Sequence, residues 1–247
     1  MAADEPRTPL PALPDETFRR VLCVVAHPDD VEYGTSAAVA AWTARGVEVG
    51  YLLLTRGEAG IDGIEPDRTR ELRSAEQVAA AAEVGVTHVE FRDHPDGVLE
   101  YGLALRRDIA EEIRRFQPDV VLTGSWELEF VAGLNMADHR AVGLATLDAV
   151  RDAGNRWVFP GTEPWSARWL LVSGDPRPTH GVDVTGGPLA AGVRSLEAHA
   201  QYLAALPWHP APADFLPAVM AQQGRALGVE HAVLFRAWDL QAPPSFD

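Results

Sequence analysis

The apolar run Val21–Val25 ends directly in the segment AHPDD, residues 26–30, and this junction limits what the chain can fold into. A continuous apolar run of this length is typical of a β-strand that is buried on both faces. The imidazole and the two carboxylates that follow it would lie at the mouth of the core, where an unpaired charge costs roughly several kcal/mol. A divalent metal ion is the simplest partner that offsets this cost. The junction therefore predicts a metal site.

Apolar runs alternate with helical patterns along most of the chain. Strand-like runs occupy residues 21–26, 47–54, 87–91, 119–123, 165–172, 182–184 and 232–237, and helical patterns occupy residues 35–45, 67–83, 101–116, 136–152, 189–206 and 213–227. This alternation is typical of βαβ units and predicts an α/β fold with a mostly parallel sheet. Residues 1–20 are Pro-rich and are expected to form a loose leader. We expect residues 21–247 to form a single domain, in which 207–247 is a C-terminal extension without an assigned role.

Composition excludes several classes of function. A net charge of −15 makes nucleic acid and anionic membranes poor partners, because both require a basic surface. The sequence contains no signal peptide and no apolar segment approaching the roughly 18 residues of a membrane span, so a cytoplasmic protein is expected. Every basic residue is arginine, which excludes chemistry that needs a lysine amine. The one cysteine, Cys23, lies inside the first apolar run and is expected to be a core residue.

A second polar cluster follows the fourth expected strand. If the strands have the common order 3-2-1-4-5, the first and fourth are neighbours at the topological switch point, where ligands bind beyond the carboxyl ends of the strands. The AHPDD segment leaves the first strand there, and a long loop from the fourth ends at Asp138 and His139, at the start of a helix. The crevice would then collect His27, Asp30 and His139. Two imidazoles and a carboxylate with an open fourth position are typical of a catalytic zinc site, and Asp29 would be free to act as a general base.

Each cluster also has an ordinary interpretation. Two aspartates after a strand usually form a solvated turn, and a sequence such as Asp138-His139 usually provides a helix cap and a surface histidine. The convergence of both clusters on one crevice is what favours the metal site.

At these residues the sequence resembles the LmbE-like, or PIG-L, family of zinc-dependent N-deacetylases, over about residues 21–206. The AHPDD segment, with Glu32 and Gly34 after it, looks like the leading motif of the family, and Asp138-His139 matches the second half of its later His-Pro-Asp-His motif. The resemblance implies a Rossmann-like fold with helices on both faces of the sheet. It also implies a hydrolase that removes an acyl group, typically acetyl, from the amide nitrogen of an amino sugar within a conjugate. Whether the chain forms a homo-oligomer is left open.

The resemblance assigns roles to five residues. His27, Asp30 and His139 would be the metal ligands, with zinc as the expected ion and another divalent metal as the alternative. Asp29 would deprotonate the zinc-bound water that acts as nucleophile, and would later pass the proton to the leaving amine. Asp138 would lie behind the ligands and orient an imidazole or the catalytic groups.

Two further residues, Arg56 and Asp96, match family positions that bind sugar hydroxyls. Both lie at the carboxyl ends of expected strands, where a ligand would bind. The ordinary alternatives are a loop ion pair between Arg56 and Glu58, and a β-turn role for Asp96 before Gly97.

The chain departs from the family at Met136. Three residues before the metal ligand, the family usually has a histidine that helps to stabilise the oxyanion, and methionine donates no hydrogen bond. Loss of one oxyanion donor costs about 10²–10³ in rate. His94 and His199 are the candidate replacements. Two alternative functions therefore stay open: an amidase that acts on a thiol-sugar conjugate, and a zinc-binding family member with little catalysis.

Overall fold

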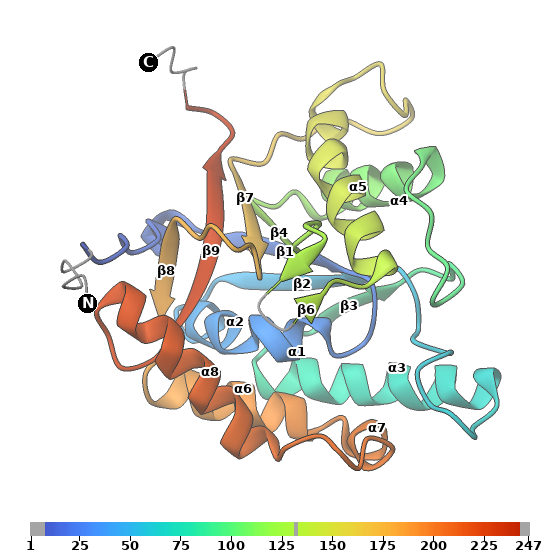
Figure 1. Ribbon diagram of the computed structural model, residues 1–247. Helices are drawn as coiled ribbons and strands as arrows, with labels where there is room; N and C mark the ends of the chain where they lie inside the picture. The colour runs from blue at the N-terminus through green and yellow to red at the C-terminus, as the bar shows by residue number, and fades with distance from the viewer. Residues whose placement is uncertain (1–7, 131–132, 243–247) are drawn as a thin grey trace.

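The computed structural model of the chain describes residues 8–130 and 133–242 (Figure 1). A seven-stranded sheet with the order β3-β2-β1-β4-β7-β9-β8 forms its centre. The strands are β1 (Arg20–Val25), β2 (Glu48–Leu53), β3 (His88–Phe91), β4 (Val120–Gly124), β7 (Trp169–Ser173), β8 (His180–Asp183) and β9 (Ala232–Asp239). The pairs from β3 to β7 are parallel, whereas β9 is antiparallel to both of its neighbours. This sheet confirms the predicted α/β fold, and β1 and β4 are neighbours as the switch point requires.

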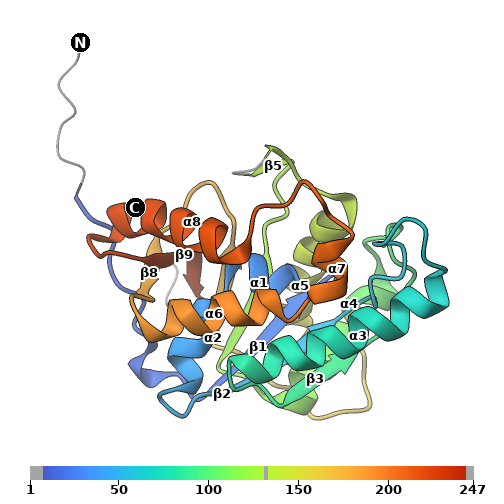
Figure 2. The ribbon, with the colours of Figure 1, turned by 90° about the horizontal axis from the view of Figure 1, so that it is seen from below.

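Helices cover both faces of the sheet, as Figures 1 and 2 show. They are α1 (Asp30–Gly34), α2 (Ser36–Thr43), α3 (Pro66–Glu83), α4 (Leu103–Phe116), α5 (Ala137–Gly154), α6 (Gly187–Glu197), α7 (Ala200–Ala204) and α8 (Pro212–Leu227), with a short 3-10 helix η1 at Asp15–Thr17. Apolar residues of α2, α6 and α8 belong to one core cluster, and those of α4 and α5 belong to a second. The two clusters lie on opposite faces of the sheet.

β1 is covered by a core cluster on each face, which explains its uninterrupted apolar sequence. Val21, Cys23 and Val25 belong to the first core cluster, and Leu22 and Val24 belong to the second. Successive side chains of a strand point to opposite faces, so a strand covered on both faces needs apolar residues at every position. β1 is therefore fixed in the centre of the sheet, and it presents its carboxyl end to the crevice beside β4.

Some local structure differs from the expectation. The predicted helix over 189–206 is two helices, because the chain leaves helical geometry at His199 (φ −79°, ψ 47°) between α6 and α7. The short helix α1 and the hairpin of β5 (Glu129–Phe130) and β6 (Gly133–Leu134) were not predicted. Elements this short carry too little periodicity to be recognised in a sequence.

Both chain ends contribute to the fold. Residues 1–7 lie outside the described residues, but residues 8–19, expected to be part of a loose leader, pack on the body of the protein. Leu13 and Phe18 are buried in the core, and the Leu13 N–H donates to the Gly181 carbonyl at 2.8 Å. In the expected C-terminal extension, β9 lies between β7 and β8 in the central sheet. A single domain over residues 21–247 stays a prediction.

Among the described residues, no helix is both long enough and apolar enough to cross a membrane. A cytoplasmic location stays a prediction.

Candidate active site

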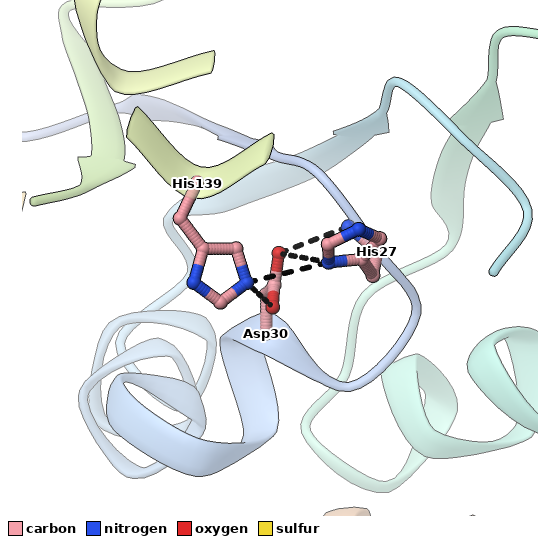
Figure 3. A group of neighbouring side chains, drawn as sticks. All are labelled: His27, Asp30 and His139. Carbon is pink, nitrogen blue, oxygen red and sulfur yellow. Dashed lines mark hydrogen bonds and ion pairs between the residues drawn. The ribbon is translucent and has the colours of Figure 1, made fainter. Parts of the chain in front are cut away.

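Side chains from two distant parts of the chain meet at the carboxyl end of β1: His27 and Asp30 from one, and His139 from the other (Figure 3). The His139 Nε2 atom lies 3.0 Å from Asp30 Oδ1 and 3.3 Å from His27 Nδ1. All three ligand atoms lie within 4.8 Å of one another, although His27 and His139 are separated by 112 residues in sequence. Two imidazole nitrogens and a carboxylate oxygen at this spacing are a donor set that fits a divalent metal such as zinc.

Backbone N–H groups hold the Asp30 carboxylate in position beside the two imidazoles. Asp30 begins α1, and its Oδ2 accepts hydrogen bonds from the N–H groups of Ala26 and His27 at 3.0 and 2.9 Å. Burial raises the pKa of the Asp30 carboxyl, but the facing imidazoles of His139 and His27 outweigh it and hold that pKa well below its usual range. Asp30 is therefore ionised, as the predicted role of metal ligand requires. The His139 side chain is 27% exposed, so this side of the cluster is open to solvent.

The second ring nitrogen of His27 faces two carboxylates. Its Nε2 lies 3.0 Å from Asp96 Oδ1 and 3.3 Å from Asp138 Oδ2. Asp138 also accepts hydrogen bonds from the Gly97 and Leu99 N–H groups at 2.8 and 3.1 Å. A carboxylate behind a ligating histidine fixes the orientation of its ring. Although His27, Asp96 and Asp138 also have metal-ligand spacing, we interpret the two carboxylates as support for His27, because the loop N–H groups already occupy Asp138.

Asp29 adopts a strained backbone conformation beside the cluster. Its φ of +93° lies in the left-handed region, which residues other than glycine rarely adopt. Arg73 Nη2 donates to Asp29 Oδ2 at 3.0 Å, and the Asp29 N–H donates to Gln77 Oε1 at 2.9 Å. Burial, together with the nearby Asp30 charge, raises the pKa of Asp29 to about 6 against the opposing effect of Arg73. A buried carboxylate with a pKa near neutrality is suited to act as a general base.

A buried polar network lies behind Asp29. Gln77 Nε2 donates to Glu32 Oε1 at 3.0 Å, and Glu32 Oε2 lies 3.6 Å from His199 Nε2. Glu32 and His199 are both fully buried. Burial lowers the pKa of His199, but the Glu32 and Asp29 carboxylates outweigh it, so the pKa stays above its ordinary value. The His199 imidazole thus pairs with Glu32 inside the protein, and this position favours a supporting role over contact with a substrate.

Asp96 and Arg56, the two residues predicted to bind sugar hydroxyls, both have partners within the protein. The Asp96 side chain is only 6% exposed, and its Oδ2 accepts a hydrogen bond from the Ala59 N–H at 2.8 Å. Arg56 Nε donates to Asp93 Oδ1 at 2.7 Å. Sugar binding by Asp96 and Arg56 stays a prediction. The Arg56–Glu58 ion pair considered as an alternative is not formed, because Glu58 pairs with Arg70 instead.

Of the two candidate replacements for the missing histidine, His199 is the buried partner of Glu32 described above, and His94 also lies against a carboxylate. His94 Nε2 lies 2.7 Å from Asp108 on α4, so its described partner is a surface carboxylate. Met136 is the N-cap residue of α5 and is 55% exposed, three residues before His139. Which group donates to an oxyanion in place of the usual histidine stays unassigned.

Arg73 and Gln77 contact Asp29 but were not among the predicted site residues. Both lie on α3, four residues apart, and both are buried, as is Glu76 between them, on the face of the helix that also buries Leu72, Ala80 and Ala81. Positions four apart lie on one face of a helix. An arginine and a glutamine in the buried stripe of an Ala-rich helix were therefore a signal that polar groups meet there.

Comparison with known proteins yields one matching family. Residues 22–150 match the family described as PIG-L: GlcNAc-PI de-N-acetylase. Diacetylchitobiose deacetylase from Thermococcus kodakarensis is 31% identical over 179 residues, which cover 70% of this chain and 66% of that protein. The 1D-myo-inositol 2-acetamido-2-deoxy-alpha-D-glucopyranoside deacetylase from Kineococcus radiotolerans is 32% identical over 188 residues, which cover 60% of this chain and 49% of that protein. The matches thus span about half to two thirds of the length of these relatives.

Solved structures share the fold. The N,N'-diacetylchitobiose deacetylase from Pyrococcus horikoshii superposes with a TM-score of 0.82 at 23% identity, covering 92% of this chain and 86% of that one. The conserved protein TT1542 from Thermus thermophilus gives a TM-score of 0.75 at 26% identity, and the superposition covers 91% of this chain and 97% of that one.

Proposed function

Since the chain belongs to the PIG-L family, we propose that it is a metal-dependent N-deacetylase acting on an N-acetylglucosamine-type amino sugar. The observation that carries the proposal is the meeting of His27, Asp30 and His139 beside the buried carboxylate of Asp29. The relatives named above are deacetylases of diacetylchitobiose and of a GlcNAc-inositol. We propose zinc as the metal, because two imidazoles and one carboxylate are typical of catalytic zinc sites.

We assign two roles to the residues of the site: three of them would bind the metal, and Asp29 would transfer protons. A divalent metal bound by the three ligands supplies Lewis-acid chemistry, since it polarises the amide carbonyl and makes water more acidic. Asp29, with a pKa of about 6, is largely ionised at neutral pH and can take a proton from the attacking water. Arg73 engages Asp29 Oδ2, so we assign proton transfer to Oδ1.

Asp29 alone can carry out both proton transfers of the amide hydrolysis. The water oxygen bonds to the amide carbon while Asp29 accepts a proton. The bond between the amide carbon and nitrogen then breaks, and Asp29 returns the proton to the leaving nitrogen. The products are a free amino sugar and acetic acid, which then ionises to acetate, and Asp29 is again ionised for the next turnover.

A second candidate function rests on Met136. With this residue in place of the usual histidine, the chain would be a zinc-binding family member with little catalysis. Cleavage of a thiol-sugar conjugate is a further alternative, and it would require a pocket that accepts a larger acyl group.

A substrate panel separates these functions. The zinc-loaded protein is incubated with N-acetylglucosamine, diacetylchitobiose, a GlcNAc-inositol and an amino sugar with a bulky acyl group, and the free amine is measured by a fluorogenic reagent. We expect amine release from the N-acetylated sugars. Release from the bulky amide alone would support the amidase. Stoichiometric zinc without any amine release would support the non-catalytic candidate.

A further inference from the structure

A second set of side chains with metal-ligand spacing lies on the far side of the His27 ring. His27 Nε2 is 3.0 Å from Asp96 Oδ1 and 3.3 Å from Asp138 Oδ2, and the ligand atoms of this set all lie within 4.8 Å of one another. The other ring nitrogen, Nδ1, faces Asp30 and His139 (Figure 3). The two sets therefore share one imidazole ring and no other side chain.

The spacing of the second set fits a zinc ion. The ligands of a tetrahedral zinc ion with bonds of about 2.0–2.1 Å lie about 3.3 Å apart. The two distances from His27 Nε2 to the carboxylate oxygens match this value. The side chains of His27, Asp96 and Asp138 are only 7%, 6% and 2% exposed, so the three groups are held together inside the protein. The same distances suit hydrogen bonds, and the number of donors separates the two interpretations.

The second set contains more acceptors than one imidazole can satisfy. The Nε2 atom of His27 carries at most one proton, so it can make one full hydrogen bond. One carboxylate is enough to orient a ligating histidine. Asp138 accepts hydrogen bonds from loop N–H groups, and Asp96 Oδ2 accepts one from the Ala59 N–H, but both carboxylates also face Nε2. One of these two oxygens is therefore left without a proton to accept.

The charge of the cluster also exceeds what one divalent ion offsets. Among the described residues, His27 is the only basic side chain within ion-pair distance of Asp96 or Asp138. With both imidazoles neutral as ligands, one divalent ion offsets two of the three carboxylates Asp30, Asp96 and Asp138. One buried negative charge remains, and a buried charge without a partner is costly. A second divalent ion in place of the Nε2 proton adds one net positive charge and removes this excess.

We propose that His27, Asp96 and Asp138 bind a second divalent metal ion, with zinc as the preferred ion and the His27 imidazolate as a bridge between the two ions. While one ion is bound, the carboxylates support His27 as described above. When the second ion binds, it replaces the Nε2 proton, which leaves to solvent, and the carboxylates become ligands. The inference goes beyond the proposed function, because it concerns metal binding and requires no turnover.

Geometry favours a structural role for the second ion. Two zinc ions bound to one imidazole ring lie about 6 Å apart, farther than the roughly 3.5–4 Å of sites in which two ions share a reacting group. The second ion would join three segments: His27 after β1, Asp96 after β3 and Asp138 at the start of α5. Solvent reaches the adjoining loop, since Gly97 is exposed, with no atom within 4 Å of where its Cβ would lie, and Val98 is 65% exposed.

A zinc titration tests the number of sites. Protein that holds one zinc ion after dialysis is titrated with zinc sulfate in a calorimeter, and we expect a second equivalent that binds at least tenfold more weakly than the first. At a free zinc concentration about 100 times the second Kd, Tm should rise by about 5 °C. Absence of a second equivalent, or one that leaves Tm unchanged, would overturn the proposal.

Three variants assign the second equivalent to its residues. His139 belongs only to the first set, so His139→Ala should lose the tighter equivalent and keep the weaker one. Asp96→Asn should lose the weaker equivalent and keep the tighter one. Asp108→Asn is the control and should keep both, because Asp108 lies 2.7 Å from His94 Nε2 in a separate carboxylate–imidazole pair. A weaker equivalent that survives in Asp96→Asn, or that disappears in His139→Ala, would contradict the assignment.

Copper(II) reports the bridge in the wild type, so this measurement does not depend on how the variants fold. Copper(II) binds nitrogen and oxygen ligands more tightly than zinc does. Two copper(II) ions joined by an imidazolate couple their unpaired spins, so the EPR signal of the two-copper protein should fall well below that of the one-copper protein. Two full, independent copper signals would place the second ion elsewhere. If the wild type releases no amine from any sugar, the proposed function fails, whereas these binding measurements still decide the second site.

Discussion

The side-chain oxygen of Gln77 accepts a hydrogen bond from the backbone N–H of Asp29 at 2.9 Å, across 48 residues of sequence. The nitrogen of the same side chain donates to Glu32 at 3.0 Å, so one amide group connects the proposed general base to a buried carboxylate. A left-handed conformation such as that of Asp29 costs roughly 1–3 kcal/mol and persists only where the surroundings hold it. Gln77 is one of the contacts that hold it.

Gln77→Met tests this link. Methionine has a similar length but replaces neither hydrogen bond, so Asp29 loses its backbone acceptor and Glu32 loses its donor. We expect kcat to fall about tenfold at unchanged zinc content, and the free energy of unfolding to fall by about 1–3 kcal/mol, the cost of an unsatisfied buried group. Steady-state kinetics, metal analysis and urea denaturation measure these effects.

Gln222→Met is the matched control, because Gln222 is an exposed residue of α8. It should leave kcat and stability unchanged. Wild-type kcat in Gln77→Met would show that Asp29 does not need this support.

Asp29→Asn removes the base while it keeps the shape of the side chain. A carboxamide cannot accept the proton of the attacking water, so we expect kcat to fall about 10²–10⁴-fold, the usual contribution of a general base. Zinc stoichiometry should not change, because Asp29 is not among the three predicted ligands. Since Gln77 acts through Asp29, adding Gln77→Met to Asp29→Asn should lower kcat no further. Near-full activity of Asp29→Asn would mean that the base has been misassigned.

Much of the fold could be predicted because it depends on patterns within single segments. The unbroken apolar run of β1 predicted a strand covered on both faces, and the alternation of strands and helices predicted the parallel sheet. The meeting of His27 with His139 followed from topology alone, since β1 and β4 are neighbours at the switch point. That these residues bind metal stays a prediction.

The remaining features depend on side-chain directions that no local pattern encodes. The Gln77–Glu32 bond joins α3 to α1 and requires the packing of both helices. The helix is interrupted at His199, whose imidazole lies 3.6 Å from the buried Glu32 carboxylate, whereas the local sequence pattern predicts one continuous helix. Asp96 was placed at the correct end of its strand, but its contact with His27 depends on a rotamer.

The His199–Glu32 pair makes stability depend on pH. The pKa of His199 is raised in the folded state above its ordinary value of 6.5: burial lowers it, but Glu32 and Asp29 outweigh burial and Arg73. The stabilisation is therefore fully present below about pH 6.5 and is lost as the pH rises through the folded-state pKa. The groups that face His199 are Glu32, Asp29 and Arg73.

His199→Gln removes this titration. We expect the free energy of unfolding of the wild type to exceed that of His199→Gln most below pH 6.5, and the difference to shrink as the pH rises. Urea denaturation over a pH series at fixed metal content measures it. A difference that does not change with pH would contradict a charged His199 in the folded protein.

His27→Ala and His139→Ala test whether the two halves of the chain form one metal site. Each variant loses one of three ligands, so we expect both to lose stoichiometric zinc after dialysis. His94→Ala is the control, because His94 pairs with Asp108 and should leave the zinc content unchanged. Zinc retained in both ligand variants would disprove the central assignment.

Asp96 and Asp138 contact the same nitrogen of His27, and replacing each with asparagine separates two roles for Asp96. If Asp96 orients His27, Asp96→Asn should weaken zinc binding about 10–100-fold, the usual effect of removing a group behind a ligating histidine. If Asp96 instead binds sugar hydroxyls, KM should rise while zinc affinity stays the same.

The contacts favour the first outcome for Asp96, because its side chain is almost fully buried against His27 and the Ala59 N–H. Asp138→Asn should weaken zinc binding to a similar degree. It should also loosen residues 97–99, since a carboxamide has one acceptor oxygen for the two N–H groups that Asp138 now binds. Chelator competition measures zinc affinity, and limited proteolysis measures the loop. Zinc affinity that falls only in Asp138→Asn would leave Asp96 free to bind substrate.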